Sequence, residues 1–247
     1  MRRVWFEAGR AHKQFDAGES ELFDAEVAVA RAAARAGVGP RVLAATASRL
    51  TTARVGRPFA KNPETLRALA QTLARFHRLP VPPAIERAQY RWLPASIVEY
   101  AKATRARSPR ATPLLAHARG LEPLVEGAPL ALCHGDVKVS NLRVWRGEVT
   151  LVDFEAARVA DPAWDLANAA LGLTLTAPEE DLLVATWADA SGESRVSALC
   201  RFHAWRLVGL VFHPLDLRAR QKGRERVPLL ERRSKEVLTA LNRPSPA

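Results

Sequence analysis

The stretch that decides the fold of this chain is Leu130-Ala-Leu-Cys-His-Gly-Asp-Val-Lys-Val-Ser-Asn-Leu-Arg-Val-Trp-Arg-Gly-Glu-Val-Thr-Leu-Val-Asp-Phe-Glu155. Two short apolar runs, residues 142–145 and 149–152, flank the pair Arg146-Gly147. Glycine readily takes the positive φ that a tight turn requires. The pattern therefore predicts an antiparallel hairpin with Arg146 and Gly147 as its loop.

A two-residue loop also sets the register of this hairpin. It places Leu142 opposite Leu151 and Asn141 opposite Val152. Directly opposed residues in an antiparallel pair lie about 5 Å apart, so Asn141 and Asp153 are brought together at the open end. Because side chains alternate along a strand, one face would be buried. That face consists of Leu142, Val144, Val149 and Leu151.

Three oxygen-bearing side chains converge at this end of the hairpin. Asp136 lies five residues before Asn141, in a polar loop that follows the apolar strand 130–133. A hard cation such as Mg²⁺ prefers a few oxygen ligands and commonly shares them with substrate phosphates. Asn141 and Asp153 suit a magnesium site. This arrangement leaves Asp136 free to accept a proton from an attacking hydroxyl group.

The ordered set His134-Gly-Asp136-x-x-x-x-Asn141, followed by Asp153-Phe-Glu155, resembles the kinase-like phosphotransferases, specifically the aminoglycoside phosphotransferase and choline kinase group. Protein kinases carry related motifs in the same order and with the same roles. The resemblance implies that Asp136 is the catalytic base. It also implies that Asn141 and Asp153 bind magnesium.

The same resemblance suggests roles for neighbouring residues. His134 would brace the catalytic loop, and Lys138 falls where protein kinases carry a lysine that touches the transferred phosphoryl group. Asp165 opens a helix and would hold the catalytic loop, which is a structural role. His77, at the end of a helix that Asn62 caps, is expected to be a core or capping histidine without chemistry.

The first 57 residues are predicted to form a small sheet with one helix. Residues 4–8 and 11–15 indicate a hairpin that carries Lys13, and a helix is expected from an N-cap at Ser20 to residue 36. Glu26 falls on the apolar stripe of that helix, where an unpaired charge is costly. Lys13 is its preferred partner, with Glu21 as the alternative carboxylate for Lys13. In the kinase-like family, such a strand lysine grips the α and β phosphates and is oriented by a helix glutamate.

Strands are also expected over residues 43–47 and 50–55, and residues 50–58 resemble the family's hinge, where backbone groups receive adenine. The backbone of Ala53 to Val55 is the predicted contact. One departure from the family pattern lies before Lys13, where the family places a further strand and a phosphate-covering loop. Only twelve residues precede Lys13, so the loop is expected to be missing or to lie upstream of this start.

Composition narrows the range of partners. The net charge is +11, with 31 Arg among the 37 basic residues, but the basic residues are scattered rather than collected in one tract. This scatter argues against a nucleic-acid partner. No apolar stretch approaches the roughly 18 residues of a membrane span, and the first residues lack a signal-peptide core. The two cysteines show no C-x-x-C spacing. We therefore expect a cytoplasmic protein without a membrane partner.

The remaining segments are expected to be mostly helical. Prolines break residues 80–129 into short pieces, with a basic run at 102–110, and helices are predicted over 176–188, 196–212 and 227–241. By family analogy, these parts would line the pocket for the phosphoryl acceptor. A choline-type site would need an aromatic cage. The candidate aromatic residues, which are more often core, are Trp92, Tyr100, Trp164, Trp187 and Trp205.

These patterns together predict an α+β, two-lobed protein-kinase-like fold, with a β-rich N-lobe at residues 1–57 and a largely helical C-lobe at residues 58–247. The predicted reaction transfers the γ-phosphoryl group of Mg-ATP, with GTP as the alternative donor, to a hydroxyl of a small molecule. Aminoglycosides, choline, amino acids and sugars all occur as acceptors in the family. The alternative is a catalytically weak or inactive regulatory module that binds a nucleotide.

Overall fold

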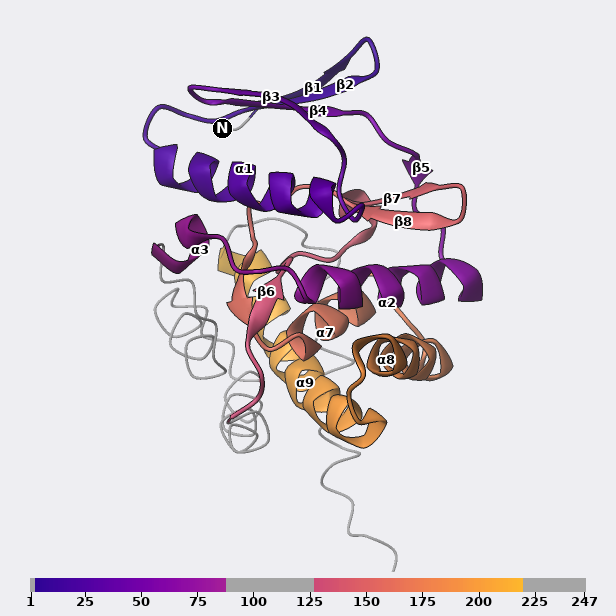
Figure 1. Ribbon diagram of the computed structural model, residues 1–247. Helices are drawn as coiled ribbons and strands as arrows, with labels where there is room; N and C mark the ends of the chain where they lie inside the picture. Colours follow the sequence, from indigo (N-terminus) through magenta and orange to yellow (C-terminus); the bar gives the residue numbers. More distant parts are fainter. Residues whose placement is uncertain (1–2, 88–126, 220–247) are drawn as a thin grey trace, which may run out of the picture. The chain divides into compact units, whose positions relative to one another are not determined.

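The computed structural model describes residues 3–87 and 127–219 (Figure 1). Contacts divide the chain into two compact units, one comprising residues 1–91 and 129–199, the other residues 92–128 and 200–247. All the described elements lie in the first unit except α9 (Arg195–Ala219), which begins there and continues into the second. The basic run at 102–110, most of the proline-rich stretch and the helix predicted over 227–241 lie outside the described residues.

A four-stranded antiparallel sheet begins the first unit. Its strands follow the order β1-β2-β4-β3. They are β1 (Arg3–Glu7), β2 (Arg10–Gln14), β3 (Val42–Thr46) and β4 (Arg49–Ala53). Helix α1 (Ser20–Arg35) contacts β3 and β4 and covers one face of this sheet (Figure 1). The strand that carries Lys13, β2, is therefore an inner strand, paired on both sides.

Predicted boundaries in this region are displaced by one or two residues, including those of all four strands. The first hairpin turns at Ala8-Gly9 rather than Gly9-Arg10, because a two-residue hairpin loop of this type needs positive φ at both positions, and these residues have φ of 45° and 75°. Glu19, not Ser20, is the N-cap of α1, since its carbonyl accepts the N–H of Phe23 as the first helical bond, at 2.9 Å.

Helix α2 (Pro63–His77) provides the centre of the first unit. Asn62 caps it as predicted, because its side chain accepts the N–H of Thr65 while the Thr65 hydroxyl bonds back to the N–H of Asn62. Its buried face packs along α8 (Ala177–Ser191) and against β8 (Glu148–Leu151). The fully buried side chains on this face include Leu66, Leu69, Leu73 and Phe76.

The central hairpin has the predicted register. Strand β7 (Leu142–Trp145) pairs with β8, Leu142 lies opposite Leu151, and the N–H of Val152 donates to the carbonyl of Asn141 at 3.0 Å. Arg146 and Gly147 form the loop with φ of 52° and 83°. The predicted inner face is buried. Strand β5 (Arg57–Pro58) pairs with the other edge of β7.

Short elements complete the first unit around this hairpin. Strand β6 (Ala131–Cys133) pairs with β9 (Arg158–Ala160), and these two strands precede and follow the hairpin in sequence. Helices α3 (Pro83–Arg87) and α7 (Ala163–Gly172) follow α2 and β9 respectively. None of the helices in the described ranges is both long and apolar enough to cross a membrane.

The end of α7 approaches the loop between β6 and β7 so closely that only glycine fits at position 172. A Cβ there would lie 2.5 Å from the carbonyl oxygen of Val137. We expect Gly172→Ala to lower the free energy of unfolding by about 1 to 3 kcal/mol, measured by denaturant titration, because the backbone itself must move. Gly18→Ala is the control, since a Cβ at Gly18 meets nothing within 4 Å. Equal stability of the two variants would contradict this packing.

Candidate active site

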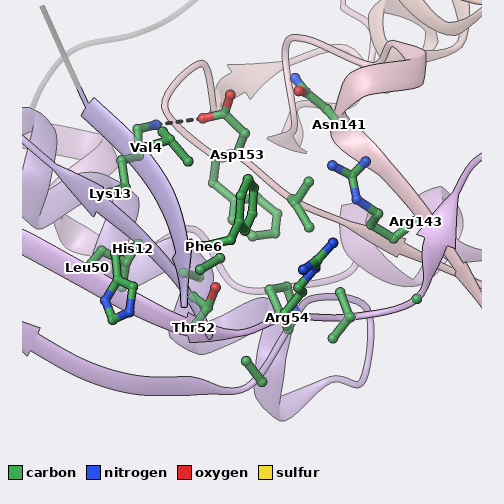
Figure 2. A pocket seen from close by; sticks show the side chains of 18 of the residues that line it. Val4, Phe6, His12, Lys13, Leu50, Thr52, Arg54, Asn141, Arg143 and Asp153 are labelled. Carbon is green, nitrogen blue, oxygen red and sulfur yellow. Dashed lines mark hydrogen bonds and ion pairs between the residues drawn. The ribbon is translucent and has the colours of Figure 1, made fainter. Parts of the chain in front are cut away.

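The ammonium group of Lys13 is surrounded by three carboxylates. From β2 its Nζ donates to Glu26 of α1 at 2.8 and 3.1 Å. It also lies 2.6 Å from Oδ1 of Asp153 and 2.7 Å from Oε2 of Glu155, both of which follow β8. Figure 2 shows the contact between Lys13 and Asp153. The contact predicted between Lys13 and Glu26 is thus present, whereas Glu21, the alternative, is exposed.

Burial and charge act in opposite directions in this cluster. Burial by itself lowers the pKa of Lys13, but the neighbouring carboxylates of Glu26 and Asp153 outweigh it and raise that pKa well above its usual value. Burial also raises the pKa of Glu26 to about 7, against the lowering effect of Lys13. One ammonium faces three carboxylates, so the cluster holds an excess of negative charge when all are ionised.

Phe154 holds the two neighbouring acidic residues in place. Its ring is buried and stacks on Phe76 of α2 with ring centroids 5.8 Å apart. Asp153 has φ of 67°, in the left-handed region that aspartate tolerates better than most residues. The anchored ring and this backbone conformation direct Asp153 and Glu155 to the ammonium of Lys13.

The loop between β6 and β7 brings Asp136, Lys138 and Asn141 together. The amide nitrogen of Asn141 donates to both the carbonyl and Oδ2 of Asp136, each at 2.9 Å. Nζ of Lys138 lies 2.5 Å from the same Oδ2. Asn141 is buried, whereas Lys138 is exposed. Asp136 thus presents a carboxylate that one amide and one ammonium hold in position.

Asp165 supports this loop from below. Its two carboxylate oxygens accept the backbone N–H groups of His134 at 2.6 Å and Gly135 at 2.8 Å. His134 in turn accepts the N–H of Asp136 at Nδ1, at 3.3 Å, and its Nε2 lies 3.0 Å from the carbonyl of Val152. A carbonyl can only accept, so Nε2 carries the proton and His134 joins the loop between β6 and β7 to the hairpin.

His77 completes the support under Asp165. The indole N–H of Trp187 donates to Nδ1 of His77 at 3.1 Å, so the proton of His77 is on Nε2, which lies 3.0 Å from Asp165. All three side chains are buried. Burial by itself raises the pKa of Asp165, but the bonds from His77 and the loop outweigh it and lower the pKa. His77 is thus a core histidine, as predicted.

Gly135 is required by the geometry of the loop between β6 and β7. Its φ is +78°, and a Cβ there would lie 2.2 Å from the carbonyl oxygen of Ala156. The backbone after β8 therefore passes directly against the residue before Asp136.

A cavity of about 350 Å³ opens beside the Lys13 cluster (Figure 2). Six of the eight site residues predicted from sequence line it, and Asp136 and Lys138 are not part of its lining. The six are Lys13, Glu26, Ala53, Val55, Asn141 and Asp153. The N–H of Ala53 already donates to the carbonyl of Arg41 at 2.8 Å. The predicted base contact therefore rests on the Ala53 carbonyl and the Val55 backbone.

The profile of the phosphotransferase enzyme family matches residues 3–203 of this sequence. The chain belongs to this family. A sequence search of curated proteins finds no match to this chain. The family predicted from the motif around Asp136 is therefore confirmed.

Solved structures with this fold include kinases of choline and of aminoglycosides. A choline/ethanolamine kinase family protein from Mesorhizobium loti aligns with a TM-score of 0.73 and 17% identity, over 98% of this chain and 85% of that one. Choline kinase LicA from Streptococcus pneumoniae aligns with a TM-score of 0.72 and 14% identity, over 97% of this chain and 89% of that one. An aminoglycoside phosphotransferase from Streptomyces rimosus, in complex with ADP and streptomycin, has a TM-score of 0.55 and 20% identity, over 81% of this chain and 87% of that one. These likenesses confirm the predicted kinase-like α+β fold.

The donor set of this family member fits a magnesium ion. Carboxylate oxygens of Glu26, Asp153 and Glu155 lie within 4.8 Å of one another, and Asn141 lines the same cavity. Oxygen ligands with excess negative charge are what a hard divalent cation prefers. Sequence reasoning gave Glu155 no role, although its place two residues after Asp153 was a usable signal. Trp187 carried no such signal, because an aromatic residue on a helix is usually core.

We expect Asp165→Asn to destabilise the chain by about 3 kcal/mol. Asp165 accepts hydrogen bonds from three donors, and the NH2 group of an asparagine, itself a donor, would face at least one of them. The lowered pKa of Asp165 means that its contribution is fully present above the unfolded value of about 3.9 and is lost as the pH falls through the folded pKa. Denaturant titrations should therefore show the gap between wild type and variant narrowing below about pH 4. Asp189→Asn, which alters an exposed ion pair, is the control and should change little.

Proposed function

We propose that this family member transfers the γ-phosphoryl group of a magnesium-bound nucleoside triphosphate to a hydroxyl group of a small molecule. The observation that carries the proposal is one arrangement. A lysine held by three carboxylates lines a cavity, and the Asp136 carboxylate is bonded to Asn141 in the wall of the same cavity. ATP is the donor that the family resemblance implies. Relatives of this fold include one solved with ADP.

Asp136 would accept the proton of the acceptor hydroxyl. The bonds from Asn141 and Lys138 fix the direction of its carboxylate, and the Asp165 network fixes the backbone beneath it. An attacking oxygen placed against this carboxylate becomes more nucleophilic as it loses its proton. Lys138, which is exposed at the edge of the loop, would neutralise charge that develops on the transferred group.

Lys13 would hold the donor phosphates, with Glu26 keeping its ammonium in position. Asn141 and Asp153, with Glu155 beside them, would hold magnesium, which neutralises the phosphate oxygens when it is bound. In the structure, the ammonium of Lys13 contacts Asp153 and Glu155 as well as Glu26. When a nucleotide binds, its phosphate oxygens would replace Asp153 and Glu155 as partners of this ammonium, whereas the buried Glu26 would remain its partner.

The fold relatives support a small-molecule acceptor, and the burial of the tryptophans bears on its type. Relatives include kinases of choline and a phosphotransferase solved with streptomycin, all of which point to small molecules that carry a hydroxyl group. Trp164, Trp187 and Trp205 are buried, so none of them offers an exposed ring to a choline-type cage. Trp92 and Tyr100 lie outside the described residues.

The first test is phosphoryl transfer from γ-labelled ATP and, in parallel, γ-labelled GTP into pooled small metabolites. We expect a labelled product with the wild type, and at least a hundredfold less with Asp136→Asn, because the amide cannot take the proton. Calorimetry should show that the variant still binds the magnesium-nucleotide complex, since Asp136 does not line the cavity. Nucleotide binding without any product from the wild type would instead favour the regulatory module.

A second test concerns Lys13. We expect Lys13→Met to weaken binding of Mg-ADP and Mg-GDP by at least tenfold in calorimetry, because the substitution leaves three carboxylates facing the phosphates without the ammonium. Lys61→Met is the matched control, because Lys61 pairs with Glu179 outside the cavity. An equal loss in both variants would show that the ammonium of Lys13 does not contact the donor.

A further inference from the structure

Two arginines line the cavity alongside the residues already discussed. At one end of it, the ammonium of Lys13 pairs with the carboxylates of Glu26 and Asp153. The other charged residues in its lining are Arg54 and Arg143, and within residues 3–87 and 127–219 neither guanidinium pairs with a carboxylate. Most of the other lining residues are apolar. Two cations in an apolar wall are therefore available to a ligand.

Arg143 is held in place before any ligand arrives. It lies on β7 directly opposite Pro58 of β5, and its Nη1 donates to the carbonyl of Ser140 at 2.9 Å and that of Leu142 at 2.8 Å. These two bonds use one end of the guanidinium group. The side chain is half-buried, and in Figure 2 it extends into the cavity.

Arg54 lies at the same end of the cavity. It stands between Ala53 and Val55, and its backbone N–H donates to the carbonyl of Gly9 at 2.8 Å. Its guanidinium carbon is 5.3 Å from the centre of the Phe6 ring, a cation–π contact that positions the group. Both arginines are thus next to the segment proposed to receive the base, and Lys13 and Asp153 are next to the proposed phosphate site.

The chemistry of the guanidinium group discriminates between purines. Arginine has five N–H donors and no acceptor. On the edge that carries N7, guanine presents two acceptors, N7 and O6, whereas adenine presents N7 and an amino group that is itself a donor. A guanidinium group can make two parallel bonds to guanine there, but it meets a second donor on adenine. The mostly apolar lining around the half-buried Arg143 strengthens this preference.

We propose that Arg54 and Arg143 recognise the base of the donor and make the cavity select guanine over adenine nucleotides. This inference rests on the proposed function and replaces ATP by GTP as the preferred donor. Arg143 supplies the fixed guanidinium, and Arg54 closes the same end of the cavity from the segment after β4. The two arginines are then specificity-determining residues that take no part in the transfer step.

The test compares the affinities of Mg-GDP and Mg-ADP by calorimetry at one salt concentration. We expect the wild type to bind Mg-GDP at least tenfold more tightly than Mg-ADP. Arg143→Met and Arg54→Met should each reduce that ratio towards one, mainly by weakening GDP. Arg57→Met is the matched control, because Arg57 is an exposed arginine of the same segment that does not line this cavity. The control should keep the ratio of the wild type.

Three results would overturn the inference. Mg-ADP binding as tightly as Mg-GDP would exclude guanine selection while leaving the proposed function intact. Equal losses of both nucleotides in Arg143→Met and Arg54→Met would show that the arginines contact phosphate or ribose rather than the base. A ratio that neither variant changes would assign the selection to other residues. If neither nucleotide binds the wild type at all, the proposed function itself fails, and thermal unfolding of each protein separates that result from misfolding.

Discussion

The ammonium of Lys13, shared by three carboxylates, is the interaction on which the rest of this site depends. It joins the sheet to α1 through Glu26 and to the segment after β8 through Asp153 and Glu155. Glu26 is buried, and a buried carboxylate without a partner would be too costly to keep ionised. Elements that are distant in sequence are therefore held together by one charge, which is also the charge that faces the cavity.

A second group of buried polar residues fixes the loop between β6 and β7, which carries Asp136. Asp165 binds two consecutive N–H groups of the loop and is itself held by His77 and, through it, by Trp187. Its hydrogen bonds keep the carboxylate ionised despite complete burial. The loop also needs Gly135, whose missing side chain lets the backbone of Ala156 approach. Contacts from Asp165 therefore hold the backbone beside Asp136, and the ammonium of Lys13 holds the carboxylate of Asp153.

Sequence patterns located the elements and six of the residues that line the cavity. Local rules sufficed for the Asn62 cap and for the register of the β7–β8 hairpin, because each depends on residues a few positions apart. The same rules misplaced the first turn and the cap of α1 by one residue, since neighbouring residues there satisfy the geometry nearly equally well. They gave no role to the side chains of Arg54 and Arg143, because scattered arginines in a basic chain do not indicate which of them line one cavity.

The sequence by itself determined the family, the kinase-like fold and the set of acidic and amide residues that meet at the end of the hairpin. It could do so because the motif residues lie close together in the sequence, and because a tight two-residue turn sets which residues of the two strands oppose each other. Only the tertiary structure decided that Lys13 touches Asp153 and Glu155 as well as Glu26, and that Trp187 supports His77. Those contacts join residues more than a hundred positions apart, and no local period or spacing records them.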